Sequence, residues 1–149
     1  MRSDLSRRHL LQVLAVGAAS TAACLCACSG ASGEPEPFGD VTAGKVADLE
    51  LNTLQQIPGA PAFIARDAGG LYAMTSTCSH EGCDLGDGVR TADSITCRCH
   101  HSQFDRNGAV LRGPASSALA HFQVELGSDG TITVHGGTRV DASVRTPAA

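Results

Sequence analysis

Two short stretches of the chain decide its fold and its chemistry: residues 78–83 read Cys-Ser-His-Glu-Gly-Cys, and residues 97–105 read Cys-Arg-Cys-His-His-Ser-Gln-Phe-Asp. Each stretch carries thiol and imidazole groups, spaced Cys-x-His in the first and Cys-x-x-His in the second. Four such ligands at two turn tips suit a tetrahedral metal, so a mononuclear zinc site is one interpretation. A second interpretation is that the four cysteines form two structural disulfides, as is common in small secreted domains.

The sequence around these stretches alternates short β-type segments with turn signals, which predicts an all-β domain with antiparallel pairing. Segments 62–66 and 71–75 flank the turn Asp-Ala-Gly-Gly and are expected to form a hairpin. Asn107-Gly108 and Asp129-Gly130 predict two further hairpin turns. No segment after residue 40 keeps a helical apolar period through three turns, so no long helix is expected there. The remaining expected strands cover residues 94–96, 103–105, 109–111, 122–126 and 131–134.

The composition limits the function classes. The chain has 149 residues, enough for one domain of ordinary size once a targeting segment is set aside. Eleven Lys and Arg residues stand against fifteen Asp and Glu residues, and neither sign forms a block. Binding to nucleic acid, or to a membrane through a basic patch, therefore has no electrostatic support. Aromatic residues make up only 3%, which indicates a small domain stabilised by something besides aromatic packing.

The first residues resemble an export signal. Arg2, Arg7 and Arg8 form a basic start, and an uncharged stretch rich in Leu, Val, Ala and Gly follows over residues 10–33. The string Ser-Arg-Arg-His-Leu-Leu at residues 6–11 is similar to the twin-arginine signal, which exports proteins in the folded state. Such a route suits a cofactor that is assembled in the cytoplasm and crosses the membrane inside a closed protein.

Three endings of this signal are open. Leu25-Cys26-Ala27-Cys28 resembles a bacterial lipobox, which makes Cys28 the candidate for lipidation. An uncleaved anchor and plain cleavage are the alternatives, since the stretch is long enough for the roughly 20 residues that span a bilayer. All three place the domain outside the cytoplasm, on the periplasmic face of a bacterial membrane. The expected parts are a signal or anchor in residues 1–28, a flexible linker in 29–40, a domain in 41–136 and a loose tail in 137–149.

The combination of Cys-x-His-x-Gly-Cys with Cys-x-Cys-His-x-Ser resembles the two-box signature of the Rieske iron-sulfur family, over roughly residues 40 to 136. The resemblance implies a Rieske-type antiparallel β-sandwich of short strands, with a cluster-binding subdomain formed by two loops. It also implies a [2Fe-2S] cluster. In that cluster Cys78 and Cys97 would hold one iron, and His80 and His100 would hold the other.

Further residues match finer features of the family. Cys83 and Cys99 correspond to the pair that forms a disulfide between the cluster loops in the quinol-oxidising, cytochrome bc-type branch, a pair that oxygenase-associated ferredoxins lack. Export to an oxidising compartment agrees with such a disulfide. Ser102 matches a serine that donates a hydrogen bond to a bridging sulfide. Gly113 and Pro114 match the loop that covers the cluster.

Three positions depart from the family pattern, and one of them is Ser116, which stands where a second proline is common. His101 stands where a glycine usually follows the second ligand histidine, and Phe104 stands where quinol-oxidising members often have tyrosine. Because Phe104 has no hydroxyl to donate a second hydrogen bond, we expect a reduction potential below that of members with both hydroxyls.

The mixed ligand set implied by the resemblance suits one-electron transfer. Two ferric irons, two sulfides, two thiolates and two neutral imidazoles sum to no net charge, whereas four thiolates would leave a dianion. Rieske potentials therefore lie at roughly −150 to +300 mV, against about −400 mV for plant-type ferredoxins. The imidazoles can also take up a proton as the cluster takes up an electron, and quinol oxidation needs both transfers.

The expected role is the electron-transfer subunit of a membrane-associated oxidoreductase, of the quinol:cytochrome c type or a molybdenum oxidase resembling arsenite oxidase. A redox protein is the expected partner and quinol a candidate donor, and the chain is not expected to be catalytic alone. A stand-alone periplasmic lipoprotein electron carrier or redox sensor is the alternative, which lipidation at Cys28 would favour. A structural zinc-binding domain is the remote alternative. The export signal, Cys83 and Cys99 disfavour the ferredoxin of a ring-hydroxylating oxygenase.

Overall fold

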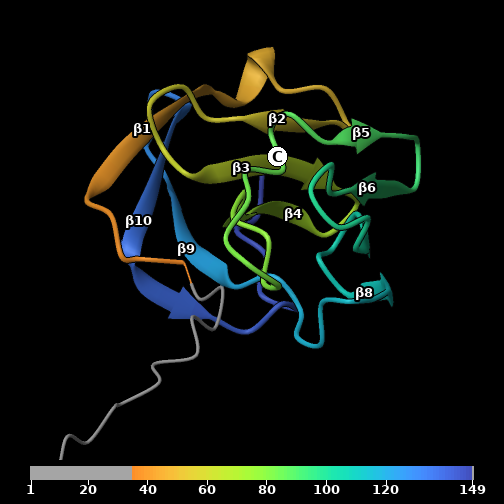
Figure 1. Cartoon of the computed structure of the whole chain (residues 1–149). Helices are drawn as coiled ribbons and strands as arrows, with labels where there is room; N and C mark the ends of the chain where they lie inside the picture. The colour runs from red at the N-terminus through yellow and green to blue at the C-terminus, as the bar shows by residue number, and fades with distance from the viewer. Residues whose placement is uncertain (1–34, 149) are drawn as a thin grey trace, which may run out of the picture.

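The computed structural model describes residues 35–148 as two antiparallel sheets, which confirms the all-β expectation. The large sheet has the strand order β1-β10-β9-β4-β3-β2 and curls around an apolar core, and the small sheet has the order β5-β6-β7-β8 (Figure 1). Within the described residues, no helix is long and apolar enough to cross a membrane. The elements are β1 (Asp40–Lys45), the 3-10 turn η1 (Val46–Asp48), β2 (Leu54–Gln56), β3 (Ala62–Asp67), β4 (Gly70–Thr75), β5 (Val89–Arg90), β6 (Ser94–Thr96), β7 (Gln103–Asp105), β8 (Val110–Arg112), β9 (His121–Leu126) and β10 (Thr131–Val140).

The end of the expected linker packs against the domain. The Phe38 ring meets the Phe122 ring edge-on, with centroids 5.0 Å apart, and Arg139 donates a hydrogen bond to the Pro35 carbonyl at 3.1 Å. The packed part of the chain therefore begins before the expected boundary at residue 41. The predicted export signal, the candidate lipidation site Cys28 and the start of the linker lie outside the described residues.

The predicted hairpin of β3 and β4 is confirmed, and it forms the wall between two apolar cores. Successive side chains of a strand point to opposite faces of the sheet, and here both faces are covered. Ile64 and Leu71 lie in the core of the large sheet, whereas Phe63 and Met74 lie in a second core beside the small sheet. This double coverage accounts for the burial of every residue of β4.

The second core supports the predicted ligand loops. Ile95 of β6 and Phe104 of β7 pair across the small sheet, and both are buried. The same core contains Cys78 and Cys97, the first cysteine of each loop. The loops therefore rest directly on apolar side chains instead of standing free in solvent.

The strand predicted at residue 109 begins one residue later. The Asp105 carboxylate accepts hydrogen bonds from the backbone N–H groups of Asn107 and Ala109, both at 2.8 Å. These bonds hold Ala109 in the turn, where Gly108 adopts a φ of 78°. The turn residues Asn107 and Gly108 were predicted correctly, but the turn extends one residue further than predicted.

The C-terminal segment is packed, so the expectation of a loose tail is wrong for residues 137–148. β10 runs on to Val140 and pairs with β9 beyond a register shift. Further along, the backbones of Leu71 and Thr146 exchange hydrogen bonds of 2.8 and 2.9 Å. Gly70 permits this close approach, because a Cβ atom there would lie 2.3 Å from the Thr146 carbonyl oxygen. Contacts with residues far away in the sequence hold this segment, and local composition does not reveal them.

Arg145 ties this segment to the rest of the domain. It donates hydrogen bonds to the Asp67 carboxylate at 2.7 Å and to the Asn107 side-chain oxygen at 2.8 Å. Its guanidinium carbon lies 4.0 Å from the centroid of the Tyr72 ring. Burial alone would raise the pKa of Asp67, but the hydrogen bond and charge of Arg145, with two backbone N–H groups, hold that pKa below its usual 3.8.

Replacing Arg145 with Met is expected to lower the free energy of unfolding by about 1–3 kcal/mol, because Asp67 and Asn107 lose a partly buried donor. Urea unfolding at neutral pH measures the loss. The depressed pKa of Asp67 contributes stability above pH 3.8 that is lost as the pH falls through the folded-state pKa. The difference between the two proteins should therefore shrink in acid.

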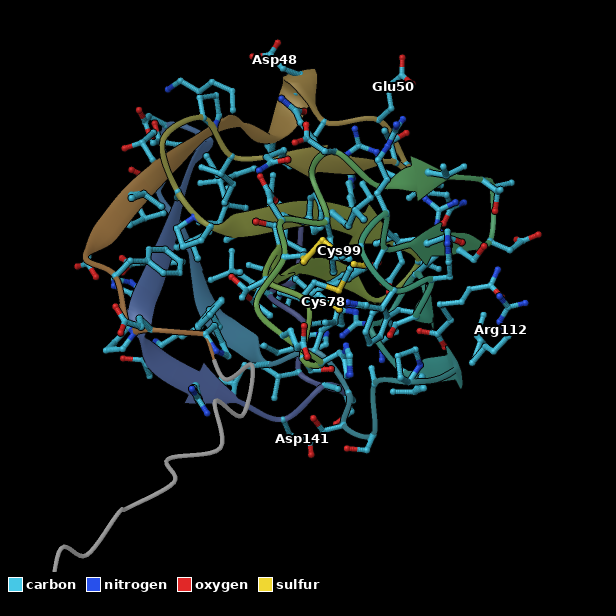
Figure 2. All side chains as sticks on the ribbon, viewed as in Figure 1. Asp48, Glu50, Cys78, Cys99, Arg112 and Asp141 are labelled. Carbon is cyan, nitrogen blue, oxygen red and sulfur yellow. A yellow bond between two sulfur atoms is a disulfide. The ribbon has the colours of Figure 1, made fainter. Side chains whose placement is uncertain are left out.

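The matched control is Arg112→Met, because Arg112 is exposed and projects outward from β8 (Figure 2). This change is expected to stay within about 0.5 kcal/mol of the parent protein. Equal losses from both substitutions would contradict the role given to Arg145.

Candidate metal centre

The two predicted ligand loops share one backbone arrangement. Loop 1 (residues 78–83) follows β4, and loop 2 (residues 97–102) joins β6 to β7. In each loop the backbone N–H of the first cysteine donates a hydrogen bond to the carbonyl of the residue five positions later. The backbone N–H of the residue four positions later donates a hydrogen bond to the carbonyl of that same cysteine. The bonds are Cys78 to Cys83 at 2.8 Å and Gly82 to Cys78 at 2.9 Å in loop 1, and Cys97 to Ser102 at 2.9 Å and His101 to Cys97 at 3.1 Å in loop 2.

The fifth residue of each loop has a left-handed backbone conformation. Gly82 has a φ of 74° and His101 has a φ of 60°. Glycine adopts this conformation freely, whereas for a residue with a Cβ atom the conformation costs roughly 1–2 kcal/mol in steric strain. This is the physical reason for the glycine that the family pattern places at 101. The His101 side chain itself is exposed.

The two first cysteines provide free, buried thiols. Cys78 and Cys97 are each 1% exposed, and neither forms a disulfide. Burial raises the pKa of the Cys78 thiol, and the neighbouring Cys97 thiol raises it further. A thiolate at this position therefore needs a compensating positive charge, which a metal would supply.

The two predicted histidines, one in each loop, face each other. The ring centroids of His80 and His100 are 4.9 Å apart, and the ring planes are nearly perpendicular. His80 Nδ1 is buried and has no hydrogen-bond partner, an arrangement that folded proteins rarely leave uncompensated. The His100 side chain is 46% exposed. Two thiols and two imidazoles, one with an orphaned nitrogen, fit a [2Fe-2S] cluster with mixed ligation.

The predicted disulfide is confirmed and joins the two loops. Cys83 at the end of loop 1 is bonded to Cys99 in loop 2, with Cα atoms 6.6 Å apart. The sulfur atoms of this bridge are drawn in yellow in Figure 2, where Cys99 is labelled. Because Cys78 and Cys97 remain free, the interpretation with two structural disulfides is wrong.

A third segment is bonded to both loops. The fully buried Ser102 hydroxyl accepts a hydrogen bond from the Ala115 N–H at 2.9 Å, and its interaction with the Cys78 thiol offsets part of the rise in the pKa of that thiol. From loop 1, the Ser79 hydroxyl donates to the Ser117 carbonyl at 2.6 Å. These contacts hold Ala115 and Ser117, which follow Gly113 and Pro114 in the chain, against the ligand loops.

Three further residues lie near the site, and the sequence motif assigns a role to one of them, Phe104. Phe104 is fully buried in the second core and offers no polar atom, as anticipated. Ser79 and Glu81 occupy variable positions of the motif, so the sequence pattern assigns no role to either residue. Glu81 Oε2 lies 3.6 Å from His100 Nε2. No local pattern could reveal this contact, since it joins two loops that only the folded chain brings together.

The fold and this donor set are those of an iron-sulfur protein with mixed thiolate and imidazole ligands. Residues 40–123 match the Rieske [2Fe-2S] domain family. The chain belongs to that family and binds a [2Fe-2S] cluster, which excludes the structural zinc alternative.

Two relatives carry the similarity beyond the motif. The cytochrome b6-f complex iron-sulfur subunit of Synechococcus sp. (strain RCC307) is 37% identical over 105 residues, which cover 64% of this chain and 58% of the relative. The chloroplastic cytochrome b6-f complex iron-sulfur subunit of Volvox carteri is 27% identical, over 87% of this chain and 73% of the relative. The chain thus spans little more than half the length of the Synechococcus protein.

A solved structure supports the fold alone. A chain in the complex of reduced oxygenase and oxidized ferredoxin in carbazole 1,9a-dioxygenase superposes with a TM-score of 0.52 and 24% identity. The match covers 68% of this chain and 97% of that chain.

Replacing both Cys83 and Cys99 with Ala is expected to lower the free energy of unfolding by about 3 kcal/mol, the value for closing a loop of about 15 residues. Cluster content should fall as well, because the bridge holds the two loops together. Denaturant unfolding and visible absorbance measure the two effects. An unchanged spectrum and melting curve would rule out this role for the bridge.

Replacing Ser102 with Ala is expected to lower the midpoint potential, because the reduced cluster loses a hydrogen-bond donor worth about 1.5 kcal/mol, or roughly 60 mV. A redox titration followed by electron paramagnetic resonance measures the shift. Ser79→Ala is the control, since the Ser79 hydroxyl bonds to the Ser117 carbonyl. Equal shifts in both variants would exclude a specific effect of Ser102.

Proposed function

We propose that the protein transfers single electrons as the iron-sulfur subunit of a membrane-associated, quinol-oxidising complex of the cytochrome bc or b6-f type. In this proposal Cys78 and Cys97 hold one iron, and His80 and His100 hold the other. The observation that carries the proposal is the disulfide-bridged pair of loops with a half-exposed histidine, since it combines a protected thiol side with an accessible imidazole side.

The residues around the site suit coupled transfer of an electron and a proton. When bound, the cluster accepts and releases one electron in a potential range that its neutral ligand set raises. Cys78 and Cys97 are buried and keep water away from the thiolates. The His100 imidazole is 46% exposed, so its free nitrogen can exchange a proton with a bound donor such as quinol.

The disulfide and the relatives support this branch of the family. A bridge between Cys83 and Cys99 is the feature that the resemblance assigns to quinol-oxidising members. The Synechococcus and Volvox relatives are both named as cytochrome b6-f complex iron-sulfur subunits. The partners in this proposal are a cytochrome subunit as acceptor and quinol as donor.

The proposal also places the domain on the periplasmic face of a bacterial membrane. A permanent disulfide requires an oxidising compartment, and the twin-arginine string at residues 6–11 provides an export route for a folded protein. The segment before residue 29 then attaches the domain to the membrane, through a lipid on Cys28 or as an uncleaved anchor.

A second candidate is a stand-alone lipoprotein that carries electrons or senses redox state. The lipobox-like Leu25-Cys26-Ala27-Cys28 favours this candidate. Purification from native membranes in mild detergent distinguishes the two. Co-elution with a b-type cytochrome supports the subunit, and elution alone with a lipid on Cys28 supports the carrier.

The test of the proposed function is a redox titration of the cluster-loaded full chain, followed by electron paramagnetic resonance at several pH values. We expect a Rieske-type signal whose midpoint potential falls as the pH rises through the histidine titration, because the reduced cluster binds protons more tightly. A signal with a midpoint independent of pH would contradict quinol as donor. Stoichiometric zinc with no signal would contradict the ligand assignment.

A further inference from the structure

Glu81 has no role in the proposed electron transfer, yet the duplicated loops give it a defined place. Glu81 is the fourth residue of loop 1, and the ligand candidate His100 is the fourth residue of loop 2. Because the two loops share the same backbone hydrogen bonds, these fourth residues are structural equivalents. Their side chains meet across the site, with Glu81 Oε2 at 3.6 Å from His100 Nε2.

The contact also indicates which nitrogen of each ring is available to iron. The Glu81 carboxylate faces Nε2 of His100, which leaves Nδ1 of that ring for the metal. In His80 the buried atom without a partner is likewise Nδ1. With iron on Nδ1, Nε2 of a neutral imidazole carries the proton and presents an N–H to the carboxylate. At 3.6 Å the pair is longer than a hydrogen bond, so the Glu81 carboxylate acts on the His100 ring through its charge.

We propose that Glu81 is a positioning residue that orients the His100 imidazole and lowers the reduction potential of the cluster. Its negative charge favours the oxidised state, because reduction adds a further negative charge beside it. In the titration that tests this, one electron passes from a mediator dye to one ferric iron, and no covalent bond forms or breaks. The inference rests on the ligand assignment of the proposed function.

The expected size of the effect follows from exposure. The Glu81 and His100 side chains are 58% and 46% exposed, so water and salt screen their interaction. Exposed pairs of this kind change an equilibrium constant about twofold to fivefold. For a one-electron couple at 59 mV per tenfold, this corresponds to roughly 18 to 41 mV.

The experiment compares the midpoint potentials of the cluster-loaded full chain and three variants at low and high salt. Glu81→Gln removes the charge and should raise the potential by the amount above at low salt, with a smaller rise at high salt. Glu81→Asp keeps the charge and should show a smaller rise than Glu81→Gln. Asp87→Asn is the matched control, since Asp87 is an exposed carboxylate of the same connecting segment and lies outside the cluster of His80, Glu81 and His100. Its potential should stay at the value of the parent protein.

The outcomes separate this inference from the function on which it rests. A normal parent signal with no shift in Glu81→Gln, or with an equal shift in Asp87→Asn, would overturn the role of Glu81 alone. A parent protein that lacks the Rieske-type signal would overturn the ligand assignment as well. Because the titration uses a mediator dye and no quinol, the result does not depend on the natural electron donor.

Discussion

The backbone hydrogen bond from the first cysteine of each loop to the carbonyl five residues later is the constraint on which the site depends. It turns six residues into a closed loop, directs the thiol inward to the second core and sets the positions of the residues that follow. The same bond occurs in both loops, so two short sequences with different residues produce one shape twice. The disulfide then joins the two copies at a fixed separation.

Packed strands support the two loops from beneath. β4 leads into loop 1 and β6 leads into loop 2, and side chains from both strands pack in the core that contains the two thiols. The hairpin of β3 and β4 belongs to this core and to the core of the large sheet, so the ligand loops are continuous with the largest packed part of the described structure. A redox site benefits from such support, because its ligands keep their geometry when the charge changes.

Much of this arrangement could be predicted from the sequence, and the failures have physical causes. β6 and β7 were predicted with their observed bounds, because turn residues flank both segments. β1, β2 and β5 were not predicted, since these are edge strands with exposed or intermediate residues and no buried apolar side chains. The packed C-terminal segment and the contact of Glu81 with His100 depend on pairing between distant parts of the chain. No local window of sequence contains that information.

The C-terminal segment determines how much of the chain is needed to reproduce the site in another protein. The ligand motif ends at Ser102, yet the hairpin that supports loop 1 is bonded to Thr146 and held by Arg145. A graft of the two loops onto a foreign scaffold would leave this support behind. Nearly the whole described domain is therefore needed to reproduce the site in another protein. The short motif identifies the site but does not contain the contacts that support it.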